Sequence, residues 1–402
     1  MTLRLLNGTL IDGTGAAPRP FDSITIRDGT IAAIDEAGSG TAHADGDATT
    51  IDLAGAHLLP GLWDAHAHLG FMLPQTDLSR TPAHERPSDR TVRAGHAAMQ
   101  ALDHGVTALR IVGEADYVDV AWKRAFAEGM YVGPRMFVCG YALSATGGHG
   151  WQTGVSVQVD GVAEVRKAAR EQMRQGADQV KLLVTGGVSS ATETMHEPQM
   201  TFDEIAAAVE VAHFKGRKVC AHIGGSLGAK MSIEAGVDCL EHGYDLDDEV
   251  IDLMVERGTY LVPTLAVTQD EAFVLEHNAP YAIEKIMKAA PRHLDSFQRA
   301  LKAGVKIATG EDMPVPFAER VVPEIETMVR AGMRPMDAIV ASTRTAAELC
   351  GVLDTVGTVE TGKLADLIVV DGDPSADIAR LHNVTMVFKE GEVVVDRRGT
   401  AR

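Results

Sequence analysis

The sequence predicts an α/β fold, a (β/α)8 TIM-like barrel with a small β-sandwich formed by the N- and C-terminal segments. Apolar, β-branched runs alternate with helical patterns through the middle of the chain, and this implies right-handed βαβ units and a parallel sheet. Eight such runs favour a closed barrel over a doubly wound open sheet, which is the alternative. The candidate strands are 58–66, 106–112, 136–138, 180–184, 219–223, 238–242, 260–265 and 305–308.

Helical patterns lie between these strands, at 162–175, 205–215 and 336–350. Thr201 and Glu204 form a capping box that opens the second helix, and Gly351 follows the third in the usual C′ position.

Both ends of the chain read as short strands punctuated by turns, at 3–6 and 24–27 and again at 365–370, 384–388 and 393–395. We therefore expect residues 1–57 and 355–402 to form one composite β-sandwich domain around a barrel of residues 58–354.

Composition limits the classes of partner. Of the 402 residues, 37 are Lys or Arg and 56 are Asp or Glu, a net charge of −19, which argues against nucleic acid and anionic membranes as partners. The N-terminus does not resemble a signal peptide, and no apolar run reaches the length of a membrane span. The four cysteines, at 139, 220, 239 and 350, are scattered, which suits free thiols in a reducing compartment. We expect a cytoplasmic protein.

Potential metal ligands lie at the ends of the predicted strands, where the chemistry of such barrels sits. His66 and His68 share one face of the first strand, so both imidazoles can reach one cation. Asp64 is either an acceptor for a ring N–H of these histidines or a solvated turn residue. His222, His242 and Asp312 each end a later strand; singly, each also reads as a core histidine or a capping aspartate.

Lys181 interrupts an apolar strand, where an ammonium group is costly unless it is paired or modified. One reading is a lysine paired with a carboxylate inside the barrel. The other is a carbamate formed with carbon dioxide, whose two oxygens can bridge two cations. The local sequence leaves both readings open.

The combined pattern resembles the amidohydrolase superfamily in its binuclear subtype with a carboxylated lysine. The resemblance is carried by Leu59-Pro-Gly-Leu-Trp-Asp-Ala-His-Ala-His68 at the barrel entry and by residues 356–370 at the exit, and it covers essentially the whole chain. It implies one divalent cation on His66, His68 and Asp312 and a second on His222 and His242, with carboxylated Lys181 and a hydroxide between them. Ligand type favours zinc, with manganese, cobalt or nickel as alternatives.

The resemblance also implies a mechanism. The bridging hydroxide attacks the carbonyl of an amide, and Asp312 passes a proton to the leaving nitrogen. Mononuclear relatives carry a His-x-x-Glu on the fifth strand, whereas this chain has no glutamate after His222. A catalytically inactive scaffold or a metal-storage protein is disfavoured because the ligand set is complete.

The glycine-rich stretch 144–151 is similar to a segment of the branch that includes prolidase-like, Xaa-amino-acid dipeptidase and imidazolonepropionase-related enzymes. It implies that His149 contacts substrate and adds Trp151 to the candidate substrate contacts; a flexible loop is the alternative. Tyr244 either lines the pocket or packs. Phe71 and Met72, in the loop after the first strand, either line an apolar substrate pocket or serve surface packing or subunit contact.

One departure bears on the substrate. Many of those dipeptidases hold the substrate carboxylate with a tyrosine shortly after the fifth-strand histidine, whereas residues 223–226 here read Ile-Gly-Gly-Ser. The expected substrate is a dipeptide or an N-acyl amino acid. A non-peptide amide, carbamate, aryl urea or cyclic amide is the alternative. Members of this family often form homo-oligomers, which we expect here too.

Overall fold

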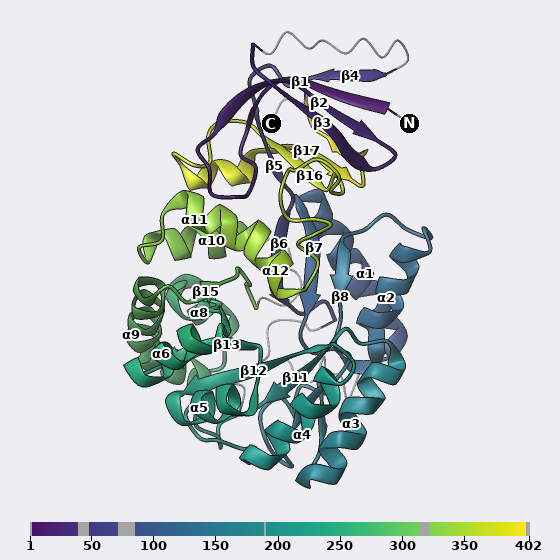
Figure 1. Ribbon diagram of the computed structural model, residues 1–402. Helices are drawn as coiled ribbons and strands as arrows, with labels where there is room; N and C mark the ends of the chain where they lie inside the picture. The colour runs from purple at the N-terminus through teal and green to yellow at the C-terminus, as the bar shows by residue number, and fades with distance from the viewer. Residues whose placement is uncertain (1, 39–47, 71–84, 189, 313–320, 399–402) are drawn as a thin grey trace.

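The computed structural model describes residues 2–38, 48–70, 85–188, 190–312 and 321–398. A β-sheet domain built from both ends of the chain sits against one end of a barrel made by the middle (Figure 1). The segment containing Phe71 and Met72 lies outside the described residues.

The β domain is one hydrogen-bonded sheet of strand order β18-β17-β16-β5-β1-β2-β3, with β4 paired to β1. β5 runs parallel to β1 and antiparallel to β16, so it joins the N-terminal strands to the C-terminal ones. Its strands are β1 (Thr2–Leu10), β2 (Arg19–Arg27), β3 (Thr30–Glu36), β4 (Thr49–Asp52), β5 (His57–Pro60), β16 (Leu367–Val370), β17 (Val384–Lys389) and β18 (Glu392–Asp396).

The barrel strands are all parallel. Their bounds are β6 (Leu62–Ala67), β7 (Val106–Ile111), β8 (Arg135–Phe137), β11 (Gln179–Leu183), β12 (Lys218–Gly225), β13 (Cys239–Asp245), β14 (Tyr260–Val262) and β15 (Lys306–Ile307). β6 to β8 form one hydrogen-bonded sheet, and β11 to β15 form another. The second sheet is extended at the β11 edge by β9 (Ala142–Ser144) and β10 (Ser156–Gln158).

Backbone hydrogen bonds join these two sheets at both pairs of neighbouring edges. Asp178 donates to the carbonyl of Val138 at 2.7 Å, and Ala65 donates to that of Thr309 at 2.8 Å. The strands therefore return to their starting point, and the predicted barrel with an additional β domain is confirmed. The open doubly wound sheet is wrong.

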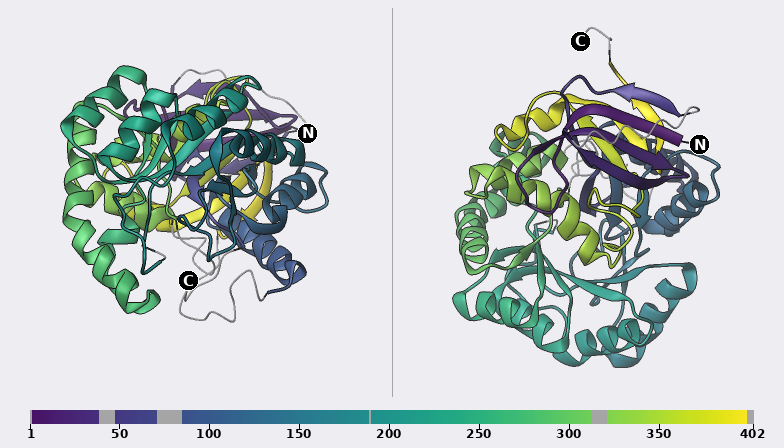
Figure 2. Two further views of the ribbon diagram at one scale, coloured as in Figure 1. Left: turned by 90° about the horizontal axis from the view of Figure 1, so that it is seen from below. Right: turned by 45° about the horizontal axis from the view of Figure 1, so that its top comes forward.

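Helices pack on the outside of these strands (Figure 2). They are α1 (Pro87–Asp103), α2 (Val118–Ala127), α3 (Gly161–Gln175), α4 (Phe202–His213), α5 (Ser226–Ala235), α6 (Asp248–Arg257), α7 (Ala266–Gln269), α8 (Glu271–His277), α9 (Pro280–Ala303), α10 (Val321–Arg330), α11 (Pro335–Val340) and α12 (Ala346–Leu349). The capping box of Thr201 and Glu204 opens α4 as predicted.

Two predicted elements are divided. The strand expected over 58–66 breaks at Gly61, where a Cβ would lie 2.1 Å from Oγ1 of Thr107, so the chain passes from the β domain into the barrel as two strands. The helix expected over 336–350 is interrupted by a π-helical turn at Ala341–Thr345, and it ends at Gly351 with φ +72°.

Among the described residues, no helix combines the length and apolar character needed to cross a membrane. All four cysteines are free thiols; Cys139, Cys220 and Cys239 are buried, and Cys350 is partly buried.

Candidate metal centre

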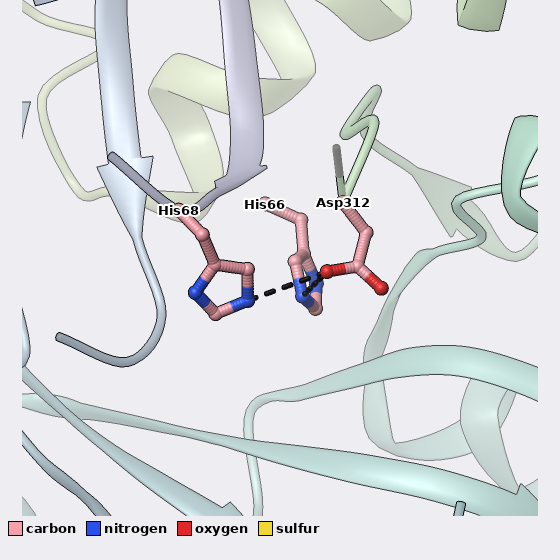
Figure 3. Close-up of side chains that lie close together, drawn as sticks. All are labelled: His66, His68 and Asp312. Carbon is pink, nitrogen blue, oxygen red and sulfur yellow. Dashed lines mark ion pairs between the residues drawn. The ribbon is translucent and has the colours of Figure 1, made fainter. Parts of the chain in front are cut away.

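His66, His68 and Asp312 meet at the carboxyl end of the barrel, with ligand atoms all within 4.8 Å of one another (Figure 3). Nε2 of His66 lies 3.2 Å and Nε2 of His68 lies 3.3 Å from the same carboxylate oxygen, Oδ1 of Asp312. The backbone N–H of Asp312 also donates to the carbonyl of His66 at 2.9 Å. Asp312 adopts a φ of +55°, an uncommon conformation for a non-glycine residue, so its placement is specified by the surrounding contacts.

The outer ring nitrogens indicate what these histidines can bind. Nδ1 of His66 lies 2.7 Å from Oε2 of Glu241, and Nδ1 of His68 lies 2.9 Å from the carbonyl of Gly113. Each acceptor favours a proton on Nδ1, so a neutral ring of either histidine would direct its Nε2 lone pair toward the position of Oδ1 of Asp312. Three electron-pair donors converging on one point suit a divalent cation.

The electrostatics of the cluster favour an anionic carboxylate at Asp312. Burial raises the pKa of Asp312, but the charge of His66 and hydrogen bonds from His66 and His68 outweigh it, so the pKa lies well below its usual range. Burial lowers the pKa of His68, and the contact with Asp312 outweighs that effect and raises it. Asp312 is therefore a carboxylate that attracts cations.

The sequence reading missed the group that orients His66. Glu241 is completely buried and also accepts hydrogen bonds from both terminal nitrogens of Arg110, at 2.9 and 3.0 Å. Burial raises the pKa of Glu241, but Arg110, Lys181 and the His66 contact outweigh it and hold the pKa well below its usual range. A charged residue inside each of two apolar strands was the available signal, because a buried arginine needs a carboxylate partner.

Asp64 fits neither sequence reading. It is buried rather than solvated, and its carboxylate accepts the backbone N–H groups of His66 at 2.9 Å and Glu311 at 3.2 Å. Burial raises the pKa of Asp64 to about 7. Asp64 therefore fixes the backbone between β6 and the Asp312 segment, whereas the imidazole acceptor is Glu241.

His222 and His242 lie side by side near the first cluster, with ring centroids 4.5 Å apart, and the ring of His242 is 4.9 Å from that of His66. Nδ1 of His242 contacts Oγ1 of Thr264 at 2.7 Å. Burial first, and then neighbouring positive groups, hold the pKa of both histidines well below the usual range. Neutral imidazole is the form that binds metals. Among the described residues, these two histidines do not belong to a group of three conventional ligands.

Lys181 lies in the middle of β11 with only 2% of its surface exposed. Its charge influences the pKa values of Glu241, His222 and His242, so it faces the same interior as the two clusters. Within the described part of the chain, no ion pair joins Lys181 to a carboxylate. The interpretation of Lys181 as the partner of a carboxylate in an ion pair is therefore not supported among the described residues.

His149 is brought to the second pair of histidines. Its ring stacks on that of His222 with centroids 4.2 Å apart, and its Nδ1 lies 3.0 Å from Oε1 of Glu193. Burial raises the pKa of Glu193, but hydrogen bonds from His149 and Gln199 outweigh it and lower the pKa. The sequence reading found the histidine of this pair but not the glutamate.

The other two candidate substrate residues, Tyr244 and Trp151, differ in burial and in their contacts with the histidines. Tyr244 is buried and stacks on His242, with ring planes 2° apart and centroids at 5.1 Å. Tyr244 also makes an edge contact with the ring of His293 at a centroid distance of 4.8 Å, and Nε2 of His293 contacts the carbonyl of His242 at 3.2 Å. Trp151 is 46% exposed, and no described ring contact joins it to these histidines.

The glycine pair after His222 is tightly covered. A Cβ on Gly224 would lie 1.6 Å from the carbonyl oxygen of Met195, and one on Gly225 would lie 2.8 Å from Nδ1 of His196. The segment that contains Met195 and His196 therefore occupies the space that larger side chains after His222 would need.

Comparison with known proteins gives concordant matches. A model of the amidohydrolase family matches residues 57–394. An ochratoxinase of Aspergillus niger is 33% identical over 367 residues, covering 84% of this chain and 75% of that protein. Its crystal structure superposes with a TM-score of 0.89 at 30% identity, covering 100% of this chain and 99% of that chain. A Xaa-Pro dipeptidase with bound methionine in its active site has a TM-score of 0.91 at 34% identity, covering 98% and 100%.

Proposed function

The chain belongs to the amidohydrolase family, as its sequence predicted, and we propose that it is a binuclear metal-dependent hydrolase that cleaves an amide bond. The observation that carries this proposal is the convergence of Nε2 of His66 and His68 on Oδ1 of Asp312. An amidohydrolase needs a cation at this position, and the donor set suits one.

The proposed ligands follow from the same geometry. His66, His68 and Asp312 would hold one cation, and His222 and His242 would hold the second. Two imidazoles need a further anionic ligand, and a carbamate on Lys181 would provide it, because that lysine is buried beside them without a described carboxylate partner. We propose zinc for both positions, since imidazole and oxygen ligands suit it. The cations would supply Lewis acidity and a water of lowered pKa.

The chain's own residues then account for proton transfer and substrate placement. Asp312 accepts the proton of the attacking water and donates it to the leaving nitrogen. An amine is a poor leaving group, and this protonation allows the C–N bond to break. His149 contacts the substrate from the side of His222, because its ring is held there by stacking and by Glu193.

For the substrate we propose a dipeptide or an N-acyl amino acid. The similar Xaa-Pro dipeptidase and ochratoxinase support an amide of an amino acid. A non-peptide amide, carbamate, aryl urea or cyclic amide is the second candidate. The pair Gly224 and Gly225 favours it, because a glycine cannot provide the side chain that would bind a free carboxylate.

A hydrolysis screen of the zinc-loaded protein tests these proposals. The panel sets dipeptides against N-acyl amino acids, aryl carbamates and ureas, with His66→Ala as the inactive variant and His96→Ala, an exposed histidine of α1, as the matched control. We expect cleavage by the wild type and by the control only. Equal cleavage by His66→Ala would contradict the proposed metal centre.

Three further assignments accompany this function as proposals. We propose that residues 1–57 and 355–402 form one domain and residues 58–354 the catalytic barrel.

We also propose that the protein resides in the cytoplasm, because its free, buried cysteines suit a reducing compartment. We also propose a homo-oligomer that acts on small molecules, and size-exclusion chromatography with light scattering would test its assembly.

A further inference from the structure

Lys285 of α9 binds the backbone of the loop that follows β11. Its ammonium group donates to the backbone carbonyls of Ser190, Glu193 at 2.5 Å and Gly187 at 3.5 Å. An ammonium group has three donors, and here three carbonyls of one short segment receive them. Lys285 thereby links α9 to the backbone of the loop that follows β11.

The same loop carries the carboxylate that orients His149. Glu193 is 6% exposed, and its two oxygens contact Nδ1 of His149 at 3.0 Å and Nε2 of Gln199 at 3.2 Å. Oε1 of Gln199 in turn accepts the backbone N–H of His149 at 2.7 Å. Ring and backbone of His149 are therefore both fixed by residues of the segment 193–199.

The loop also limits the position of the ring sterically. A Cβ on Gly187 would lie 2.2 Å from Cε1 of His149, so this part of the loop touches the imidazole directly. Because Gly187 and Glu193 both contact the ring, a displacement of these two residues would move both the steric boundary and the hydrogen-bond acceptor of His149.

We propose that Lys285 and Glu193 are positioning residues that hold His149 in place for substrate binding, with Lys285 acting through the loop backbone. The proposal rests on the proposed function, which assigns His149 to the substrate. Ordering a loop costs conformational entropy, and hydrogen bonds from a cation to its carbonyls offset that cost. A displacement of about 1 Å in a positioning group can reduce the rate by about 100-fold.

Lys285→Met tests the proposal, with Lys288→Met as the matched control because Lys288 lies on the same helix but is exposed. We expect faster amide hydrogen exchange across residues 186–199 and a change in the downfield ring N–H resonance of His149, assigned by its loss in His149→Gln. We also expect unchanged zinc content and a fall in kcat/KM of about tenfold or more. Lys285→Arg should restore most of each property.

Glu193→Gln, compared with Glu197→Gln on the exposed side of the same loop, should change the His149 resonance and kcat/KM without faster loop exchange. Unchanged loop exchange and an unchanged His149 resonance in Lys285→Met would overturn the proposal, as would a changed resonance with an unaltered kcat/KM. Exchange and resonance need no substrate. A wild type that cleaves no member of the panel would therefore refute the proposed function, while these two readouts still decide whether Lys285 holds His149.

Discussion

Oε2 of Glu241 lies 2.7 Å from Nδ1 of His66, and both residues are almost completely buried. The other oxygen of the same carboxylate receives Arg110. One buried carboxylate therefore both neutralises an arginine and sets the tautomer of a proposed metal ligand.

Glu241→Gln should weaken zinc binding at the first position by about 10–100-fold, because the amide no longer raises the basicity of His66. It should also lower the free energy of unfolding by about 3–5 kcal/mol, since Arg110 loses its counter-charge in the interior. Chelator competition and urea denaturation measure the two effects. Glu256→Gln, a change at an exposed glutamate, should leave both unchanged.

Lys181→Gln should remove the second cation and most of the activity, because a glutamine cannot form a carbamate. Wild-type protein supplied with 13C-bicarbonate should show a carbamate carbon signal that the variant lacks. Lys218→Gln, at the partly exposed start of β12, is the control. A wild type without that signal but with two bound zinc ions would show that Lys181 contributes no carbamate.

Asp312→Asn should reduce kcat by about 10²–10⁴-fold, the usual contribution of a positioned acid–base group, while much of the zinc remains on the histidines. Zinc content by mass spectrometry and kcat on the best panel substrate are the measurements. Full activity in this variant would exclude Asp312 as the proton carrier. Asp248→Asn, at a largely exposed aspartate, should behave as wild type.

Glu324 predicts a pH dependence of stability. It is completely buried and accepts backbone N–H groups of Leu265 at 2.8 Å and Ala266 at 2.6 Å, and burial raises its pKa to about 8 from 4.5. The folded state therefore holds this proton more tightly than the unfolded chain, and the stability it contributes is lost as the pH rises from about 4.5 to about 8. Glu324→Gln should flatten this part of the curve of unfolding free energy against pH, and Glu326→Gln should not.

The parts of the fold predicted from sequence were those encoded locally. The eight strand candidates reappear near their expected positions because each is a short apolar run bounded by turns. Gly61 divides the first of them, since the reason for the break is a close approach to Thr107, 46 positions further along the chain (107 − 61). The π-helical turn at Ala341–Thr345 leaves the apolar spacing of its helix nearly intact, so the pattern could not reveal it.

In the candidate site, too, the sequence predicted the residues that one element positions but not the partners that tertiary packing brings to them. Side chains at strand ends, such as His66 and His222, were found because a barrel gathers all strand ends at one face. Their partners were not, because Glu241 meets His66 across 175 positions and Lys285 meets Glu193 across 92. Strand alternation and helix periodicity describe one element at a time, and these pairs depend on the packing of two.

The hydrogen bond from Asp312 to the carbonyl of His66 crosses the seam at which the last barrel strand meets the first. The proposed first cation would therefore take its ligands from segments 244 residues apart (312 − 68), which become neighbours only after every intervening strand has found its place. A partly folded chain would contain the His66–His68 pair but not the third ligand. High-affinity zinc uptake during refolding would thus mark completion of the ring, and metal would favour the finished barrel over every open intermediate.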